Sequence, residues 1–545
     1  MRKYRSLSAA VFVVVLCALA GGFSGRRALA QDQLDQQYRV LADALQAIED
    51  NYVGETESDR LVYSAISGML QTLDPHSSFM SPNDYRQMRE RQEGRYFGLG
   101  IQIGAIDGDL TISQVFEGSP AYEKGLRRGD VIARIEKDNT KGWTTNNAVE
   151  KLRGPRGTSV NIGIRRVGYD KLIDLQVPRD AVLMATVPVS VMLDASTGYI
   201  RVSDFGENTD RELGDALRDL TRKGMTRLVF DLRENPGGAL DQAIKVTNRF
   251  IAKGKLVVST RGRVQNSDQD YHATESSEYL NLPMLTLVNR NSASASEIVS
   301  GALQDYDRSL IVGETTFGKA LVQSVYKVSQ NAGAAITTAR YITPSGRMIQ
   351  RPWDGTFDDY LAYRYREQDA AKAHSEKDLK YTVVLGRKVY SGGGVEPDER
   401  FDGPVEGFNP SRFGRTLYAR NYPHNVFGRY AQQFARRGDT RIPPSPTTKV
   451  VGPDFEVTAE MVAEFKELAK KEPIKWDEAA WEKDQDFIKA MIHNDIDVDL
   501  FGLSRAYLNL AKRDPQLQFA LSKFSEAQQL LEQSRQSTTA RRASR

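Results

Sequence analysis

Two segments of this chain place a turn of small residues between an apolar strand and a helix. The first spans 228–240 and contains the turn Gly237-Gly238, and the second spans 284–303 and contains a turn of serine and alanine. Further strand-like runs and helical patterns alternate between residues 181 and 400. The sequence therefore predicts an α/β core over this part of the chain.

The second turn carries three serines at alternate positions, Ser292, Ser294 and Ser296. A hydroxyl just before a helix lies beside free N–H donors, and small neighbours leave room for a substrate backbone. A serine in this place can equally be a helix cap with no chemical role. The turn alone leaves both interpretations open.

A lysine with a glutamine four positions later follows in the apolar segment 310–325. If this segment is extended, Lys319, Leu321 and Gln323 point to one face, because side chains alternate along a strand. The glutamine can then hold the lysine rigidly, whereas a solvated surface lysine is the common alternative. In the glycine turn, the N–H groups of Gly237 and Gly238 can be aimed at a ligand oxygen.

Three stretches in this order, DLRENPGG, SASASE and TFGKALVQ, resemble the carboxy-terminal processing, or tail-specific, serine proteases. That family uses a Ser/Lys pair in place of Ser-His-Asp, a known variant of the triad. The resemblance implies that Ser294 is the nucleophile, that Lys319 is the general base and that Gln323 orients the lysine.

The same resemblance implies an oxyanion hole made of the N–H group of Ala295 and that of Gly237 or Gly238. One position departs from the family pattern, because Ala320 stands where a second glycine is expected after the lysine. This departure affects only local backbone freedom, since the catalytic side chains are all present.

The residue types suit this chemistry. A serine hydroxyl needs a base to take its proton, and a lysine can be that base when burial lowers its pKa toward neutrality. A Ser-His-Asp site would need a distant histidine brought in by folding, because none of the five lies within the three motifs: His76, His272, His374, His424 and His493. We predict no metal site and no cofactor.

Length and composition indicate a soluble globular protein of three or four domains, with 545 residues, 40% of them hydrophobic and 27% charged. The formal net charge of +3 is nearly balanced. Nothing therefore points to a nucleic acid or an acidic polymer as partner.

Residues 1–30 have the layout of a signal peptide, with basic residues before an apolar run at 9–20 and the small-x-small site Ala28-Leu29-Ala30. An uncleaved anchor is the alternative, although the run is short for a bilayer span. We expect a periplasmic or otherwise extracytoplasmic protein. The only cysteine, Cys17, lies in this segment, so the mature chain would contain no disulfide.

Residues 31–93 are predicted to be helical. A heptad-like stripe calls for a partner helix, so we expect a homo-oligomer, while packing on its own domain is the alternative. A second helix near 61–73 should stop before Pro75. The stripe consists of Leu34, Tyr38, Leu41, Leu45, Ile48 and Tyr52.

Residues 94–180 read as a small β-rich unit that resembles a PDZ domain. The strings GLGI at 98–101 and GLRRGDVI at 125–132 stand at the distance expected of its carboxylate-binding loop and its helix-to-strand signature. PDZ domains capture a chain end by adding it as a strand, and the loop N–H groups hold the terminal carboxylate. The resemblance assigns this role to Leu99, Gly100 and Ile101, with unfolded or C-terminally exposed proteins as substrates.

The resemblance further implies a crotonase-like protease core over 181–404, into which the PDZ domain is inserted. Residues 405–532 are predicted to be a helical extension that contains a proline-rich linker at 441–448. Its apolar faces are Met461, Val462, Phe465 and Leu468, and then Leu503, Tyr507, Leu508 and Leu510. The tail 533–545 is predicted to be disordered.

Two other functions compete. Residues 313–319 spell GxxxxGK after an apolar strand, but Ala320 replaces the Ser or Thr that would hold Mg²⁺ in a nucleotide site. A non-catalytic PDZ adaptor or chaperone would be favoured by loss of the Ser/Lys/Gln set, and all three residues are present. The sequence leaves open whether an activating partner protein is needed.

Overall fold

The computed structural model describes residues 35–106, 108–116, 118–166, 169–328, 331–353, 360, 363, 375–401, 411–419, 425–435 and 451–543. They form two compact units, the first built from the described residues up to 84 and within 325–336, and the second from the remainder. The predicted signal segment with Cys17, the linker 441–448, His374 and His424 lie outside the described residues. Within the described residues, no helix has both the length and the apolarity needed to cross a membrane.

The first unit begins with a helix over residues 35–51, followed by α2 (Ser58–Gln71). Strand β1 (Ser78–Met80) then pairs antiparallel with the first residues of β18 (Gly333–Ile342). Four residues of the predicted stripe are solvent-exposed, Leu45 is half-buried and Leu34 lies outside the described residues. The four exposed fractions are 61% for Tyr38, 49% for Leu41, 43% for Ile48 and 63% for Tyr52.

In the second unit, α3 (Pro82–Glu93) leads into an antiparallel β-sheet domain. The sheet order is β3-β4-β5-β7-β8, with β6 paired to β5, and a separate pair β2-β9 encloses it in the sequence. Thirteen buried side chains, among them Leu110 and Ile162, form its core. The bounds are β2 (Arg95–Gly98), β3 (Ile101–Ile106), β4 (Asp109–Val115), α4 (Pro120–Glu123), β5 (Val131–Ile135), β6 (Asp138–Asn139), α5 (Thr145–Leu152), β7 (Ser159–Arg165), β8 (Ile173–Pro178) and β9 (Asp180–Leu183).

The central sheet has the order β10-β11-β12-β15-β16-β21 and is parallel except for the pair β10-β11. Continuous apolar runs form its middle strands, as expected for parallel strands covered on both faces. The bounds are β10 (Val189–Met192), β11 (Thr197–Arg201), β12 (Arg227–Asp231), β15 (Met284–Val288), β16 (Leu310–Gly313) and β21 (Glu399–Arg400).

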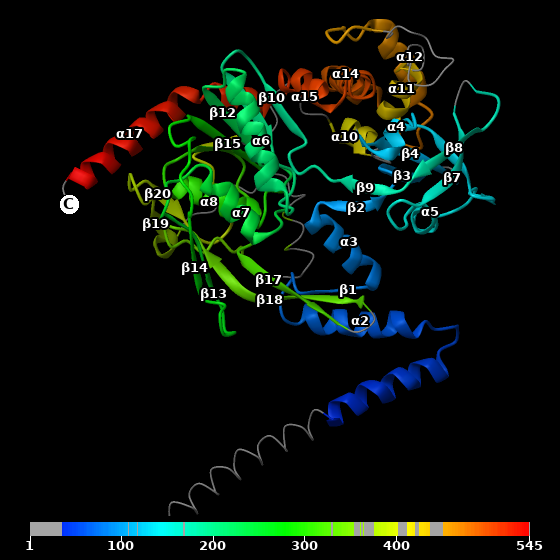
Figure 1. Ribbon diagram of the computed structural model, residues 1–545, viewed down its shortest axis with the longest axis horizontal. Coiled ribbons are helices and arrows are strands. Elements are labelled where there is room, and N and C mark those ends of the chain that lie inside the picture. Colours follow the sequence, from blue (N-terminus) through cyan, green and yellow to red (C-terminus); the bar gives the residue numbers. More distant parts are fainter. Residues whose placement is uncertain are drawn as a thin grey trace, which may run out of the picture. The chain divides into compact units, whose positions relative to one another are not determined.

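Three helices pack on one face of this sheet: α6 (Thr209–Arg222), α7 (Leu240–Asn248) and α8 (Ala295–Asp305) (Figure 1). Alternate residues of β12 divide between the two faces, because Leu228 and Phe230 join the core beneath these helices while Val229 joins the opposite core. Helices α7 and α8 follow the two turns predicted from the sequence. The α/β alternation is therefore confirmed.

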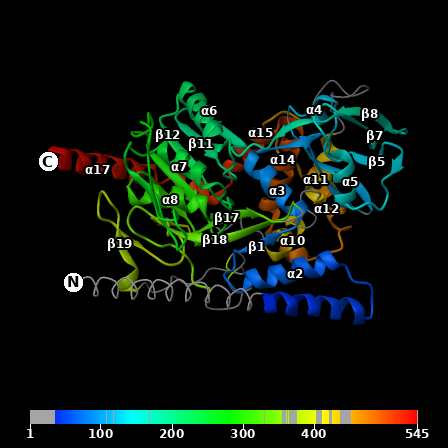
Figure 2. The ribbon, with the colours of Figure 1, turned by 60° about the horizontal axis from the view of Figure 1, so that its bottom comes forward.

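The opposite face is covered by the C-terminal helices α16 (Pro515–Leu521) and α17 (Phe524–Ala543), which bury Leu517, Phe524 and Leu530 against it. The disorder predicted for 533–545 is wrong as far as Ala543, because α17 continues to that residue (Figure 2). Ser534 and Ser537 donate hydrogen bonds to backbone carbonyls of the core, which anchors a segment too polar to reveal itself by apolar periodicity.

A second sheet has the order β1-β18-β13-β14, with β17 also paired to β18. It supplies the strands that follow the predicted lysine. The bounds of its remaining strands and of the short elements after it are β13 (Leu256–Arg261), β14 (Gln269–His272), β17 (Leu321–Lys327), η2 (Glu376–Asp378), β19 (Leu379–Tyr381) and β20 (Lys388–Tyr390).

The helices between β21 and α16 form an additional apolar core centred on Phe427, Phe465, Trp481 and Ile488. Met461 and Phe465 of the predicted apolar face are buried there, whereas Tyr507 and Leu508 pack toward the central sheet. The bounds are α10 (Arg412–Ala419), α11 (Val426–Ala435), α12 (Ala459–Ala469), α13 (Glu478–Lys483), α14 (Gln485–Phe501) and α15 (Leu503–Ala511).

Candidate active site

Ser294 lies at the N-terminus of α8, where the chain turns sharply out of β15. Its backbone has φ +54° and ψ −112°, a conformation that costs energy for a residue with a side chain. The side chain is half-buried, while the adjacent residues on both sides are buried. Of the three serines in this turn, Ser294 is the one that reaches the surface.

Ser292 and Ser296 are fully buried and have structural hydrogen bonds. The Ser292 hydroxyl donates to the carbonyl oxygen of Leu232 at 2.8 Å and accepts from the Asn289 N–H at 3.0 Å. The Ser296 hydroxyl donates to the carbonyl oxygen of Asn235 at 3.0 Å. The two flanking serines thus tie the turn at residues 292–296 (the serine turn) to the loop that follows β12.

Lys319 lies two residues before β17 and is half-buried. Its Nζ atom donates a hydrogen bond to Oε1 of Gln323 at 2.7 Å. The structure therefore brings together the lysine and the glutamine predicted to share one face of an extended segment.

The carboxylate of Glu297 joins Ser294 to Lys319. Oε2 accepts the backbone N–H groups of both residues, each at 2.8 Å. Oε1 accepts the Gly318 N–H at 2.7 Å and the Thr316 hydroxyl at 2.5 Å. One carboxylate thus fixes the separation between the backbones of the predicted nucleophile and base.

Burial raises the pKa of Glu297 to about 7, and the four hydrogen bonds oppose that rise. The side chain is fully buried. A change in its protonation state therefore directly alters the hydrogen bonds that its four donors make. Sequence reasoning missed this residue, although Ser294-Ala295-Ser296-Glu297 carries the S-x-x-E signature of a capping box.

Tyr341 on β18 supplies a second shared contact. Its buried hydroxyl lies 2.7 Å from the carbonyl oxygen of Lys319 and 3.2 Å from that of Ser294. Burial, together with the charge of Glu297, raises its pKa well above the usual value, so the phenol keeps its proton. No pattern in the sequence marks this tyrosine.

Gly237 lies directly beside the serine turn. With φ +102°, a Cβ atom at this position would stand 2.7 Å from Cβ of Ser294 and 2.8 Å from the Ala295 nitrogen, so only glycine fits. The Gly237 N–H donates to Oδ1 of Asn235 at 2.9 Å. Ala295 is the first residue of α8, so its N–H has no acceptor within the helix.

Asn235 and Glu234 connect the loop at residues 234–238 (the glycine loop) to the serine turn. The carbonyl oxygen of Asn235 accepts the Ala293 N–H at 3.0 Å. The Glu234 carboxylate accepts the side-chain amides of Asn289 and Asn291 at 2.6 and 2.9 Å. These bonds make the two loops one rigid group.

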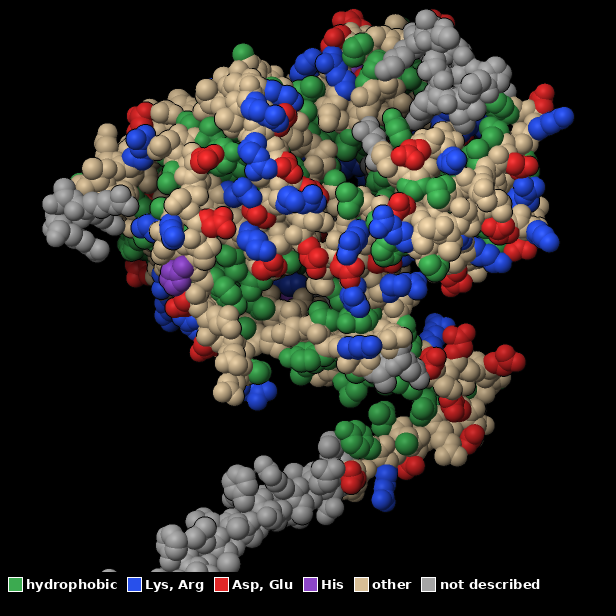
Figure 3. Space-filling view, viewed as in Figure 1, with side chains coloured by type: hydrophobic (Ala, Val, Ile, Leu, Met, Phe, Trp, Pro, Cys, Tyr) green, Lys and Arg blue, Asp and Glu red, His purple; other side chains and the backbone are tan. Residues whose placement is uncertain are grey.

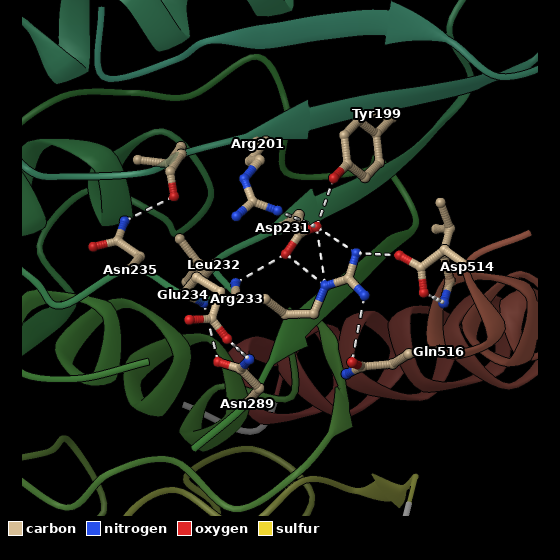
Figure 4. A network of polar contacts seen from close by, with 12 residues as sticks. Tyr199, Arg201, Asp231, Leu232, Arg233, Glu234, Asn235, Asn289, Asp514 and Gln516 are labelled. Atoms are coloured by element: carbon tan, nitrogen blue, oxygen red, sulfur yellow. Dashed lines mark hydrogen bonds and ion pairs between the residues drawn. The ribbon is translucent and has the colours of Figure 1, made fainter. Parts of the chain in front are cut away.

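Asp231 and Arg233 form a buried charge network at the end of β12 (Figure 4). Asp231 accepts from the Tyr199 hydroxyl at 2.6 Å and from Arg233 Nη2 at 2.7 Å. Burial opposes its ionisation, but the charges of Arg233 and Arg201 outweigh that effect and hold the pKa of Asp231 below its usual value. The DLR stretch is therefore a structural anchor for the loop that follows it.

The predicted carboxylate-binding loop joins β2 to β3. Gly100 has φ +84°, and a Cβ atom there would collide with Ser119, so the loop requires glycine. Burial raises the pKa of Tyr96 to about 12, while the charge of Arg153 and, more weakly, the nearby N–H groups of Gly100 and Ile101 work against that rise. The Tyr96 hydroxyl thus lies beside two donors that the resemblance assigns to a substrate carboxylate.

The three described histidines lie in other places. The His76 N–H donates to Asp74 in the first unit, His272 ends β14, and the His493 ring contacts Asp497 within α14. The described residues contain no group of three or more His, Cys, Asp or Glu side chains arranged to hold a metal ion.

Comparison with known protein families gives three matches. The model of peptidase family S41 matches residues 196–361, and the PDZ domain model matches residues 86–165. The model described as the activating protease CtpB N-terminal domain matches residues 24–83.

Two curated relatives are both described as carboxy-terminal processing proteases. A carboxy-terminal-processing protease of Bartonella bacilliformis is 38% identical over 350 residues, which are 62% of this chain and 80% of the relative. The carboxy-terminal processing protease CtpA of Bacillus subtilis is 33% identical over 361 residues, 65% of this chain and 76% of the relative. Among solved structures, the photosystem II D1 C-terminal processing protease is 26% identical with a TM-score of 0.34, covering 67% of this chain and 93% of that chain.

Proposed function

Because the chain belongs to the carboxy-terminal processing serine proteases of peptidase family S41, we propose that Ser294 is its nucleophile, Lys319 its general base and Gln323 the residue that orients the base. One observation carries this assignment. Glu297 and Tyr341 each bind the backbones of both Ser294 and Lys319, which gives the pair a fixed separation. Preorganisation of this kind is what a two-residue catalytic site needs.

In the proposed reaction, neutral Lys319 accepts the proton of the Ser294 hydroxyl while the serine oxygen bonds to the carbonyl carbon of the scissile peptide. The lysine ammonium then gives its proton to the leaving amine as the C–N bond breaks. An acyl group remains on Ser294. Water adds to it with the same lysine as base, which releases the carboxylic acid product and restores the serine.

The developing oxyanion needs N–H donors beside Ser294. Ala295 is suited to this because its N–H opens α8 and has no helical acceptor. The Gly237 N–H already serves Asn235, so we assign the second donor to Gly238. Gly237 is required instead for its lack of a side chain beside Ser294.

Gln323 accepts a hydrogen bond from Lys319 Nζ, and either protonation state of the amine can donate it. The glutamine therefore holds the lysine in place without adding a negative charge. A carboxylate at this position would raise the pKa of the lysine, so that less of the neutral amine would be available as a base near neutral pH.

We further propose that the PDZ domain binds the C-terminal carboxylate of unfolded or C-terminally exposed proteins through Leu99, Gly100 and Ile101. The signal-like residues 1–30 support exported proteins as substrates and an extracytoplasmic location, with or without an uncleaved anchor. An activating partner protein that acts on the PDZ domain would fit this arrangement. Tyr96, whose hydroxyl lies beside this loop, would then border the bound carboxylate.

The test is cleavage of an unfolded protein by purified full-length enzyme carrying Ser292→Ala, Ser294→Ala or Ser296→Ala. We expect Ser294→Ala to be inactive at an unchanged melting temperature. The flanking variants should lower the melting temperature, because each removes a buried hydrogen bond, yet cleave while folded. Cleavage by Ser294→Ala together with a folded but inactive flanking variant would reassign the nucleophile.

A further inference from the structure

The first turn of α16 lies at the ends of the two strands that carry the candidate active site. Oδ2 of Asp514, the residue before this helix, forms an ion pair with Nη2 of Arg233 at 2.7 Å (Figure 4). Gln516 donates from Nε2 to the carbonyl oxygen of Val288 at 3.0 Å. Arg233 follows β12, and Val288 ends β15, so one turn of helix contacts both strand ends.

Arg233 is held from two sides. Its guanidinium donates hydrogen bonds to Asp231 at the end of β12, and the Arg233 side chain is only 12% exposed. Asp514 supplies the second carboxylate from a segment 281 residues later, and Gln516 accepts a longer bond from Nη1 at 3.4 Å. Removal of the Asp514 charge would leave the guanidinium with one ionic partner and with freedom to move.

The position of Arg233 matters because the glycine loop begins with the next residue. Glu234 has φ +59°, an uncommon conformation for a residue with a side chain. Asn235 forms hydrogen bonds with the serine turn. The loop continues directly to Gly237 and Gly238. A shift of Arg233 is therefore passed along a short, hydrogen-bonded connection to the proposed oxyanion donors.

The apolar side of the C-terminal helices keeps this turn in place. Leu517, Phe524 and Leu530 are buried against the central sheet. Asp514 also caps α16, since Oδ1 accepts the Leu517 N–H at 3.1 Å. The segment is thus packed on the sheet and presents its first turn to the ends of β12 and β15.

We propose that residues 514–530 are part of the catalytic unit, with Asp514 and Gln516 as positioning residues. Asp514 holds the glycine loop through Arg233, and Gln516 holds the end of β15 through Val288. This inference deepens the proposed function and rests on it. It assigns a catalytic purpose to a C-terminal segment that lies outside the region matched by the family models.

The test compares Asp514→Asn with Glu399→Gln in the full-length enzyme. Asparagine is as good an N-cap as aspartate, so Asp514→Asn removes the charge and keeps the cap. Glu399→Gln is a matched control. Glu399 lies on β21 and forms an ion pair at 2.8 Å with Lys523, which belongs to the segment 514–530. Steady-state kinetics on an unfolded substrate and melting temperatures are measured for both.

We expect Asp514→Asn to lower kcat by about tenfold with KM changed less than twofold, because the oxyanion donors are misplaced and the substrate sites are not. Glu399→Gln should keep wild-type kcat at a similar melting temperature. Asp514→Glu should recover part of the loss. Equal kcat values for Asp514→Asn and Glu399→Gln would overturn the proposal.

Gln516→Ala is the second variant if Asp514→Asn fails to fold, and it should lower kcat in the same manner but less. A wild-type kcat for Gln516→Ala together with an unfolded Asp514→Asn would assign the segment to stability alone and reject its catalytic role. Ser294→Ala is run beside them. Residual cleavage by that variant would count against the proposed nucleophile, which separates the two failures.

Discussion

At the scale of single residues, the proposed active site depends on groups outside the Ser294/Lys319 pair. Glu297 and Tyr341 set the separation between Ser294 and Lys319, while Gln323 sets the direction of the amine. The catalytic chemistry needs only a hydroxyl and a neutral amine. The surrounding hydrogen bonds provide the geometry that makes such a pair effective.

Lys319→Arg should be inactive, with a loss of about 10²- to 10⁴-fold, because a guanidinium keeps its proton at working pH and cannot act as a base. Wild-type activity should rise with pH as the lysine deprotonates. Gln323→Ala should lose about tenfold, since it loosens the base but does not remove it. Initial rates from pH 6 to 10 check this, and an active arginine variant would end the Ser/Lys proposal.

Glu297 predicts a pH-dependent stability. Its pKa in the folded protein is about 7, above the ordinary 4.5, so the folded state holds more protons than the unfolded state between these values. The contribution to stability is complete below about pH 4.5 and is lost as pH rises through 7, by about 3 kcal/mol. Denaturant unfolding of wild type and Glu297→Gln at several pH values should show that the free energy of unfolding of wild type falls relative to that of the variant across this window. A difference in unfolding free energy that does not change with pH would contradict the raised pKa of Glu297.

Tyr96 predicts an unusual gain from a deletion. Tyr96→Phe removes a hydroxyl that lies beside the Gly100 and Ile101 N–H groups. If this hydroxyl competes with a peptide carboxylate, its removal leaves both donors to the peptide. The affinity for a peptide with a free C-terminus should rise by about three- to tenfold, the value of roughly one hydrogen bond. Fluorescence anisotropy with free-acid and amidated peptides is the measurement. Unchanged or weaker binding of the free acid would show that the tyrosine does not compete.

At the scale of elements, the strands and turns of the site were predictable and its side-chain network was not. Buried parallel strands must be apolar throughout, and the turns that approach a substrate must be small, so β12, β15 and their turns are visible in the sequence. The Glu297 contact with the Ser294 N–H has a local signature in the sequence, the S-x-x-E capping box at the start of α8. Tyr341 and the pair Arg233–Asp514 left none, because those contacts exist only once distant segments are folded together.

The helix at 35–51 predicts self-association. Leu41→Asp with Ile48→Asp places two charges on the exposed stripe, and Gln36→Asp with Gln46→Asp places two charges on the other side of the same helix. Light scattering should report a lower mass for the first variant and an unchanged mass for the second, because a helix pair cannot bury unpaired carboxylates. Equal masses for the two variants would exclude this stripe as an interface.

At the scale of the whole molecule, peptide binding and peptide cleavage are assigned to different domains of one chain. On the face in Figure 3, Lys and Arg side chains are interspersed with Asp and Glu, and the formal net charge is +3. This mixed surface charge offers no extended region of one sign to attract a substrate. In the proposed function, the PDZ loop supplies the donors for a chain end and its carboxylate, and Ser294 acts on a stretch upstream of that end.

The most direct test of the account is mass spectrometry of the products formed from one unfolded polypeptide, supplied as a free acid and as a C-terminal amide, with wild type and Ser294→Ala. We predict that wild type cleaves the free acid about tenfold faster or more, because the amide loses charge-assisted hydrogen bonds worth roughly 1.5–3 kcal/mol each, and that Ser294→Ala cleaves neither. Equal rates on the two forms would remove the tail-recognition role, and products from Ser294→Ala at the wild-type rate would contradict the central claim.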